Sequence, residues 1–407
     1  MNKLWTRDFS IITIGTIVSM LGNSIAGFAI SLLVLDYTES TLLYTLFLVI
    51  YNLPKLVMPM LVGPYLDKFS RKKVIYLMDF LCAAIFVAVY FVLKAGFFHY
   101  GAFSILAAAL GGINSIYQVA YESFYPTLIP EGNYRKAYSI SSLMIPLSAA
   151  MLPVASYIYE IVGLEPLFLL DAAAFFIAAV FETQIQAEET HMSTLSSRFD
   201  FKQYCVDFKE GMRYIFAEKG LLIITVYFFL NNLTGSGTEA LYLPWFKSTP
   251  GLGVMKYTYI TTSALIGRLV ACAMHYRRDL PAKWKFDLVI WCYIIYGTIQ
   301  ATMLFVPVGI MMPMNFLMGL VGISSYNIRI SATQNYVPDS HRGRFNGVFQ
   351  MFCNLGSVFS QLIAGAMSEV MNERAIILIL MSFNLFFCFT VMLRGRDHVK
   401  PIYNKEL

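Results

Sequence analysis

The chain has 407 residues, of which 57% are hydrophobic and only 14% are charged, and its mean hydropathy is +0.61. Soluble globular domains carry about 25% charged residues, so this composition excludes that class and predicts a multi-span membrane protein. The formal charge of +5 does not indicate a nucleic-acid-binding protein, because the 30 Lys and Arg residues lie between apolar segments and do not form one patch.

Twelve apolar segments are long enough to cross about 30 Å of hydrocarbon as helices. In chain order they are expected at residues 9–35, 41–62, 74–94, 100–122, 137–161, 166–183, 220–243, 256–276, 286–305, 309–330, 345–368 and 375–394. The first follows Lys3 and Arg7 but is too long for the apolar core of a signal peptide, so we expect it to be a membrane span.

The Lys and Arg residues between these segments predict the orientation of the chain. With the N-terminus in the cytoplasm, 23 of them fall on the cytoplasmic side and four on the other side. Positive charge favours cytoplasmic loops. We therefore expect a multi-pass protein of the cell's inner (plasma) membrane with both termini in the cytoplasm.

The chain divides into an N-terminal six-helix half (1–183), a linker (184–219) and a C-terminal half (220–407). In the linker, Phe208, Met212, Ile215 and Phe216 share one face of a predicted amphipathic helix. Such a helix either lies on the inner membrane surface or simply connects the halves.

A shift of 208 residues superposes the two halves. It places Asn23 on Asn231, Gly27 on Gly235 and Asp79 on Asp287. The matched residues occupy the same points of corresponding spans, which indicates an internal repeat. Two parallel six-helix halves are typical of transporters whose substrate path runs between them. The predicted fold class is an all-α membrane protein of twelve transmembrane helices in two pseudo-symmetric halves.

The loop "GPYLDKFSRKKV" between the second and third spans combines Gly63, Asp67 and a basic cluster that begins at Arg71. In this loop the sequence resembles the major facilitator superfamily, although Ser70 stands where a second glycine is usual. The resemblance implies a conformational latch. Asp67 would accept hydrogen bonds from the start of the eleventh span, and Arg71 would pair with Glu122 at the end of the fourth. Alternatively, these cations only enforce topology.

Several further segments resemble the bacterial drug-efflux branch of that superfamily, which includes macrolide exporters. They are "RKKVIYLMDF", "YPTLIPEGNYRKA", "LFLLDAAAFFIAA", "FKEGMRYIF" and "VPDSHRGRFNGVFQ". The resemblance implies transport by alternating access, and efflux of an amphipathic small molecule or drug. It also implies a protein that acts as a monomer.

An ionisable residue inside a span is costly and is therefore a functional candidate. Proton coupling needs a carboxyl that loads and releases a proton. Asp171 and Glu239, both expected in the outer third of their spans, are the candidates for proton coupling. Glu239 follows "NNLTGSGT", a stretch that glycines could unwind. Asp79 and Asp287 are expected to be structural partners of nearby Lys and Arg.

Polar residues within the spans are candidates for the wall of a substrate cavity. They are Asn23, Gln118, Asn231, Asn232 and Arg329. The abundant Phe, Tyr and Met residues suit a bulky amphipathic substrate, although most should pack or face lipid.

The chain contains no P-loop, no HExxH motif and no GxSxG motif, and its six Cys are scattered without a CxxC pair. An ATP-driven pump, an enzyme, a metal site and a bound cofactor are therefore not expected. The predicted function is proton-coupled efflux, with small molecules, protons and the lipid bilayer as partners. An importer, a uniporter, a lipid flippase and a non-transporting membrane sensor are the alternatives.

Overall fold

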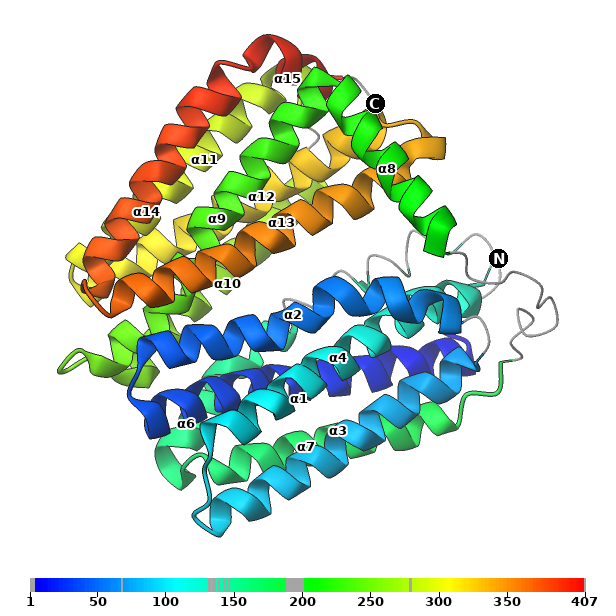
Figure 1. Cartoon of the computed structure of the whole chain (residues 1–407), viewed down its shortest axis with the longest axis vertical. Helices are drawn as coiled ribbons and strands as arrows, with labels where there is room; N and C mark the ends of the chain where they lie inside the picture. Colours follow the sequence, from blue (N-terminus) through cyan, green and yellow to red (C-terminus); the bar gives the residue numbers. More distant parts are fainter. Residues whose placement is uncertain are drawn as a thin grey trace. The chain divides into compact units, whose positions relative to one another are not determined.

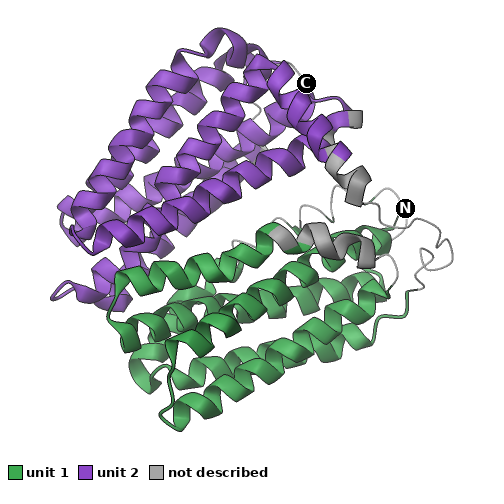
Figure 2. Cartoon of the chain, in the orientation of Figure 1, with its two compact units in different colours: residues 1–199 green, residues 200–407 purple. Residues whose placement is uncertain are grey.

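The computed structural model describes the chain except residues 1–3, 67–68, 131–132, 134–136, 138–139, 142–143, 145–146, 188–200, 278–279 and 406–407. The regular structure of the described residues is entirely helical. The chain forms two compact units, Met1–Phe199 and Asp200–Leu407, coloured separately in Figure 2. The amphipathic helix of the linker therefore belongs to the second unit.

The helices of unit 1 run alongside one another in Figure 1. They are α1 (Arg7–Thr38), α2 (Thr41–Leu66), α3 (Arg71–Lys94), α4 (Tyr100–Phe124), α6 (Met151–Val162) and α7 (Glu165–Thr183). Helix α7 packs against both α1 and α3, and α2 packs against α4. Capping residues fix several of the starts. For example, the hydroxyl of Ser70 accepts a hydrogen bond from the Lys73 amide and begins α3.

Unit 2 repeats this arrangement with additional helices at its ends. Its helices are α8 (Phe201–Ala217), α9 (Lys219–Ser248), α10 (Gly253–Arg277), α11 (Lys285–Thr302), α12 (Val308–Tyr336), α13 (Asp339–Ser368), α14 (Glu373–Phe387) and α15 (Arg396–Tyr403). Helix α14 packs against α9 and α11, and α10 packs against α12. These are the pairings of α7 with α1 and α3, and of α2 with α4.

The 208-residue repeat is visible in the helix boundaries. Helix α7 begins at Glu165 and α14 at Glu373, 208 residues later. Helices α4 and α12, which begin at Tyr100 and Val308, differ by the same number. Since the corresponding helices also make the same contacts, the repeat found in the sequence is a repeat of structure.

Two glycines of the repeat bring helices unusually close together. A Cβ atom on Gly111 of α4 would lie 2.0 Å from the carbonyl oxygen of Tyr51 in α2. In unit 2, a Cβ on Gly319 of α12 would lie 2.0 Å from the carbonyl oxygen of Ala264 in α10. Only a residue without a side chain permits this backbone approach. Each unit therefore contains a tightly joined helix pair at this position of the repeat.

Nine helices of the described chain are long and apolar enough to cross a membrane. Two shorter apolar helices, Thr41–Leu56 and Leu147–Val162, fall in the second and fifth predicted spans, and α10 occupies the eighth. The predicted all-α fold with multiple membrane spans is confirmed. Large apolar side chains such as Ile105, Phe91 and Trp291 point outward from the bundles, as a lipid environment allows.

Helix α8 packs on unit 2 through its apolar face. Ile215 is fully buried there, and Phe208 and Met212 pack against the same cluster, whereas Phe216 is 57% exposed. Its other side is fixed by an ion pair of 3.0 Å between Glu210 and Arg344 of α13. Three of the four residues predicted for the apolar face thus pack against the rest of unit 2, and Phe216 does not.

Candidate functional site

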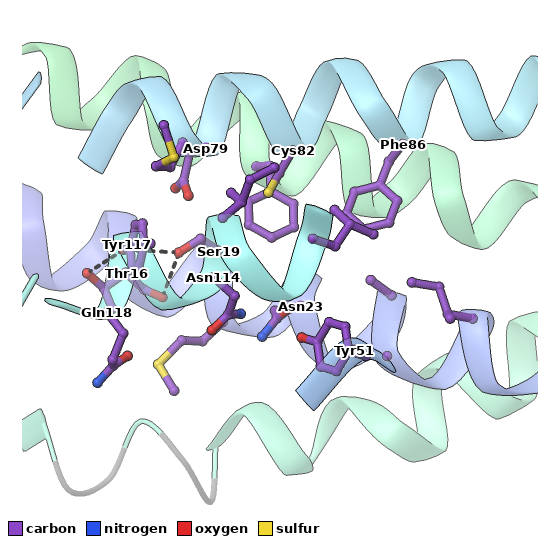
Figure 3. Close-up of a pocket in the computed structure, with 18 of the residues that line it drawn as sticks. Thr16, Ser19, Asn23, Tyr51, Asp79, Cys82, Phe86, Asn114, Tyr117 and Gln118 are labelled. Atoms are coloured by element: carbon purple, nitrogen blue, oxygen red, sulfur yellow. Dashed lines mark hydrogen bonds between the residues drawn. The ribbon is translucent and has the colours of Figure 1, made fainter. Parts of the chain in front are cut away.

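Unit 1 contains a cavity of about 270 Å³ between α1, α2, α3 and α4 (Figure 3). Its wall is mostly apolar. The aromatic lining residues are Phe47, Tyr51, Phe86, Tyr117, Tyr121 and Phe175. The amides of Asn23, Asn114 and Gln118 add polar groups. The described lining residues include one acid, Asp79, and no Lys or Arg. A wall of this kind suits a neutral or cationic amphipathic molecule.

Asp79 points into this cavity from α3 (Figure 3). It is 2% exposed, and its Oδ2 atom is buried without a hydrogen-bond partner among the described residues. Among the described residues, Asp79 therefore lacks the ion pair with Lys or Arg that was predicted for both Asp79 and Asp287. Asp287 does pair with cations, at 3.5 Å from Arg396 and 3.8 Å from Lys400.

The difference between these repeat-related acids follows from where their helices begin. Helix α11 begins only at Lys285, after a short 3-10 turn, so Asp287 lies in its first turn. The first turn of a helix favours an anion. Helix α3 already begins at Arg71, so Asp79 lies two turns inside. The same position of the repeat is thus half-buried and paired in unit 2 but fully buried in unit 1.

Two further acids, Asp171 and Glu182, are buried on α7 where this helix contacts α1. Both are 0% exposed. A Cβ on Gly22 would lie 2.7 Å from Oδ1 of Asp171, and a Cβ on Gly15 would lie 2.9 Å from Cγ of Glu182. The two glycines of α1 therefore leave the space that the two acids occupy.

The structure places Asp171 deeper than its sequence predicted. Its neighbour Gly22 is the sixteenth of the 32 residues of α1, so Asp171 lies at the middle of α1 and not near an end. Neither of its carboxyl oxygens has a hydrogen-bond partner in the described part of the chain. Asp79 lies close enough to act electrostatically on both Asp171 and Glu182. Three buried acids thus share the interior of unit 1.

Hydroxyl groups connect the cavity to Glu182. The Tyr117 hydroxyl donates to Oε1 of Glu182 over 3.4 Å, and it lies 3.3 Å from the Thr16 hydroxyl and 3.5 Å from that of Ser19. Thr16, Ser19 and Tyr117 line the cavity, and Figure 3 shows their contacts as dashed lines. The other carboxyl oxygen of Glu182 has no partner among the described atoms.

The N-terminal residues proposed from sequence are only partly brought together. Asn23 and Gln118 both line the cavity. Arg71 does not contact the Glu122 carboxylate as expected. It donates to the backbone carbonyl of Ser123 over 3.1 Å, while Glu122 accepts a 2.6 Å hydrogen bond from Gln118.

Gly63 falls within α2, and Asp67 lies outside the described residues. The latch itself stays a prediction.

The C-terminal candidates lie in unit 2, on α9 and α12. Asn231 is half-buried, and Asn232 donates to the Phe228 carbonyl and accepts from Ser357 of α13. Glu239 is exposed and accepts a 3.1 Å hydrogen bond from Tyr296. Glu239 therefore already has a partner, unlike Asp171.

The expected unwinding before Glu239 is absent, because α9 is continuous from Lys219 to Ser248. Gly237 of that stretch instead allows two helices to pack closely. A Cβ on Gly237 would lie 2.4 Å from the Ser360 carbonyl oxygen, and the Gly237 amide donates to the Ser360 hydroxyl. The absence of a side chain at Gly237 thus allows α9 to approach α13 closely.

Arg329 of α12 is surrounded by aromatic rings. Its guanidinium carbon lies 4.7 Å from the ring centre of Phe228, 4.9 Å from that of Phe349 and 5.3 Å from that of Tyr326. The residue is 9% exposed. A planar guanidinium stacks on rings in a way that an ammonium does not. This packing gives Arg329 a clear structural role beside the predicted lining role.

We expect Arg329→Lys to lower the free energy of unfolding by about 1–2 kcal/mol, because the stacked, desolvated cation–π contacts are lost while the charge stays. Thermal unfolding of the purified protein measures this. Arg394→Lys on the exposed surface is the matched control and should leave the melting temperature unchanged. Equal losses in both variants would contradict the role of the rings.

Sequence reasoning missed Tyr117 and Glu182. Glu182 is the second-last residue of the segment "FFIAAVFET" and looks like an ordinary acid at a span's end. Tyr117 belongs to the series Tyr117, Tyr121 and Tyr125, whose four-residue spacing places three hydroxyls on one helix face. That spacing was the available signal.

Comparisons with known proteins agree on one fold. The profile of the Major Facilitator Superfamily matches residues 12–360. An uncharacterized MFS-type transporter of Bacillus subtilis (strain 168), YkuC, is 24% identical over 262 residues, which are 63% of this chain and 60% of that protein. The match thus spans less than two thirds of that relative.

Solved structures resemble the whole chain at low sequence identity. The nucleoside transporter NupG superposes with a TM-score of 0.72 at 11% identity, covering 96% of this chain and 99% of that one. A bacterial homologue of the iron transporter ferroportin, in its inward-facing state, gives 0.67 at 13% identity, covering 97% and 98%. At these identities the likeness shows the fold alone.

Proposed function

Because the chain belongs to the major facilitator superfamily, and is thus a secondary transporter and not an enzyme, we propose that it exports an amphipathic small molecule in exchange for protons. The cavity of unit 1 carries this proposal. It combines an aromatic and aliphatic wall, three amides and one buried acid. The structural relatives are named for nucleoside, iron and metal transport, so the fold by itself selects no substrate.

The buried acids support proton coupling. A charge inside a membrane span is expensive, and a proton is the smallest group that can neutralise a carboxylate there. Asp79 lines the cavity, so a cationic substrate and a proton can compete for the same carboxyl. Such competition couples the two fluxes in opposite directions, which is what exchange requires.

Asp171 supports the same proposal from the position behind the cavity wall. Of the two acids proposed from sequence, it is fully buried without a partner, whereas Glu239 is exposed and bonded to Tyr296. We therefore favour Asp171 over Glu239 as a proton-binding residue.

The conformational latch remains part of the proposal. Gly63, Asp67, Arg71 and Glu122 would hold one state of the transport cycle on the cytoplasmic side. The contact of Arg71 with the end of α4 supports a link between these helices. Placement in the plasma membrane with both termini in the cytoplasm, and action as a monomer, belong to the same proposal.

Flux in proteoliposomes tests this function. Purified protein is reconstituted, a pH gradient is imposed, and uptake of lipophilic cations, macrolides, siderophores and lipids is measured. We expect a pH gradient to drive flux of at least one cationic or neutral amphipathic compound. Flux that is indifferent to pH would favour a uniporter or a lipid flippase, and absence of all flux would favour a sensor.

Asp79→Asn should reduce the gradient-driven flux by about 5- to 150-fold, the range of typical coupling free energies, because the amide cannot bind a proton. Asp287→Asn is the matched control, since it removes the repeat-related acid that is paired near the surface. Its flux should equal that of the wild type. Equal losses in the two variants, or no loss in Asp79→Asn, would contradict a role for the cavity acid.

A further inference from the structure

Glu182 lies outside the lining of the cavity but has the features of a binding site of its own. Its side chain is 0% exposed, its Oε2 atom has no partner within the described chain, and Gly15 provides the space around it. Leaving a buried carboxylate half unsatisfied is costly unless a cation or a proton occupies the site. The residue therefore needs a function that outweighs this cost.

The second unit shows that the fold does not require this acid. By the 208-residue repeat, Glu182 corresponds to Thr390, Gly15 to Ile223 and Tyr117 to Ser325. Helix α14 packs against α9 as α7 packs against α1, and Thr390 lies in the π-helical turn Cys388–Leu393 that follows α14. Since unit 2 forms the same bundle without any of the three, the acid, its space and its tyrosine occur together for another reason.

We propose that Glu182 is a proton-loading site that exchanges protons with the cavity through the hydroxyl of Tyr117. The proposal deepens the proton exchange proposed above by adding a second carboxyl behind the cavity wall. The site is reached from Thr16, whose hydroxyl can donate to the Tyr117 oxygen while Tyr117 donates to Oε1 of Glu182.

The proton transfer balances without any change in the charge of Tyr117. A hydronium ion in the cavity gives a proton to the Tyr117 oxygen, directly or through Thr16, and Tyr117 passes its own phenolic proton to the Glu182 carboxylate. Neutral Tyr117, a neutral carboxyl and water result. The O···O distances of 3.3 and 3.4 Å are long for hydroxyl hydrogen bonds, as is common at proton-transfer sites before ligands bind.

Other charged and titratable groups lie near Glu182, on the elements that pack around α7. Asp79 of α3 acts electrostatically on Glu182, and Tyr121 of α4 stacks on Tyr117 at 6.2 Å between ring centres. Just beyond α7, Lys72 donates to the Ile185 carbonyl, and Asp8 accepts from the Gln186 amide. Lys72 and Asp8 thus both contact the backbone beyond Glu182.

Infrared spectroscopy of the full chain in lipid nanodiscs tests the proposal without any substrate. Asp79, Asp171 and Glu182 each contribute a carbonyl stretch when protonated at neutral pH, and we expect Glu182→Gln to remove one component of this band. Tyr117→Phe should shift this band, because the carboxyl loses its hydrogen bond. Tyr125→Phe is the control, since its hydroxyl donates to the Ala137 carbonyl and not to Glu182, and it should leave the band in place.

Three results would overturn the proposal. The band can be identical in wild type and Glu182→Gln, the Glu182 component can shift equally in both tyrosine variants, or this component can vanish when sodium replaces potassium at constant pH. The last result would identify the site as a sodium site. Because these readings need no transport, they remain decisive even if export in exchange for protons is disproved.

A transport measurement distinguishes a proton-relay role of Tyr117 from a purely structural one. In proteoliposomes, Tyr117→Phe should slow the pH-driven flux of any compound that the panel assay shows to be transported. We expect this flux to fall by about 5-fold or more relative to substrate exchange at equal pH in the same vesicles. Equilibrium exchange does not require net proton movement. A purely structural tyrosine would lower both rates alike, and that outcome would remove the relay from the proposal.

Discussion

Gly111→Ala and Gly319→Ala should each lower the free energy of unfolding by about 3 kcal/mol or more. The added methyl group would lie 2.0 Å from a backbone carbonyl oxygen, of Tyr51 in the first case and of Ala264 in the second. A backbone cannot turn aside as a side chain can, so the paired helices must separate. The yield of monodisperse protein in detergent and its melting temperature measure the effect.

The repeat provides the matched controls. Gly27 and Gly235 are also related by 208 residues, but a Cβ on either would meet nothing within 4 Å. Gly27→Ala and Gly235→Ala should therefore keep the wild-type melting temperature, or raise it slightly because alanine favours a helix. If all four variants behave alike, close helix approach does not explain the glycines of this fold.

The second large effect is expected for Asp171→Asn. The substitution keeps the size of the side chain, which fits against Gly22, but removes the ability to bind a proton. We expect pH-driven flux to fall by about 5- to 150-fold, while substrate exchange at equal pH persists. Reconstituted vesicles, with and without a pH gradient, separate the two quantities.

Asp36 supplies the control for Asp171. It is also an acid of a unit 1 helix, near the end of α1, but its carboxylate accepts hydrogen bonds of 3.0 and 3.3 Å from the Tyr159 hydroxyl. Because this acid already has a partner, Asp36→Asn should leave the pH dependence of flux unchanged. A comparable loss in Asp36→Asn would show that any acid of unit 1 matters and would refute the special position of Asp171.

The helices were predictable because membrane spans depend on local properties. Length and apolar character determine which segments cross a bilayer, and these are read directly from residues such as those of 71–94. The predicted 74–94 and the observed Arg71–Lys94 differ only by the first turn, which Ser70 caps. The family resemblance of the loop at Gly63 was likewise sufficient for the superfamily.

The site was less predictable because it depends on helix pairing. Asp79 and Asp287 occupy the same position of the repeat, yet the later start of α11 exposes one and the earlier start of α3 buries the other. Glu182 follows an apolar run and gives no local sign that Gly15, 167 residues earlier, leaves space for it. Such contacts between distant segments are fixed by packing and not by sequence pattern.

The asymmetry of the duplicated units also concerns how stability is distributed in the molecule. Unit 1 carries three interior carboxyls with unsatisfied oxygens, whereas the positions of Asp171 and Glu182 are held in unit 2 by Ile379 and Thr390. Unsatisfied buried groups weaken a bundle. At these two positions the first half of the duplication thus bears a desolvation cost that its twin avoids.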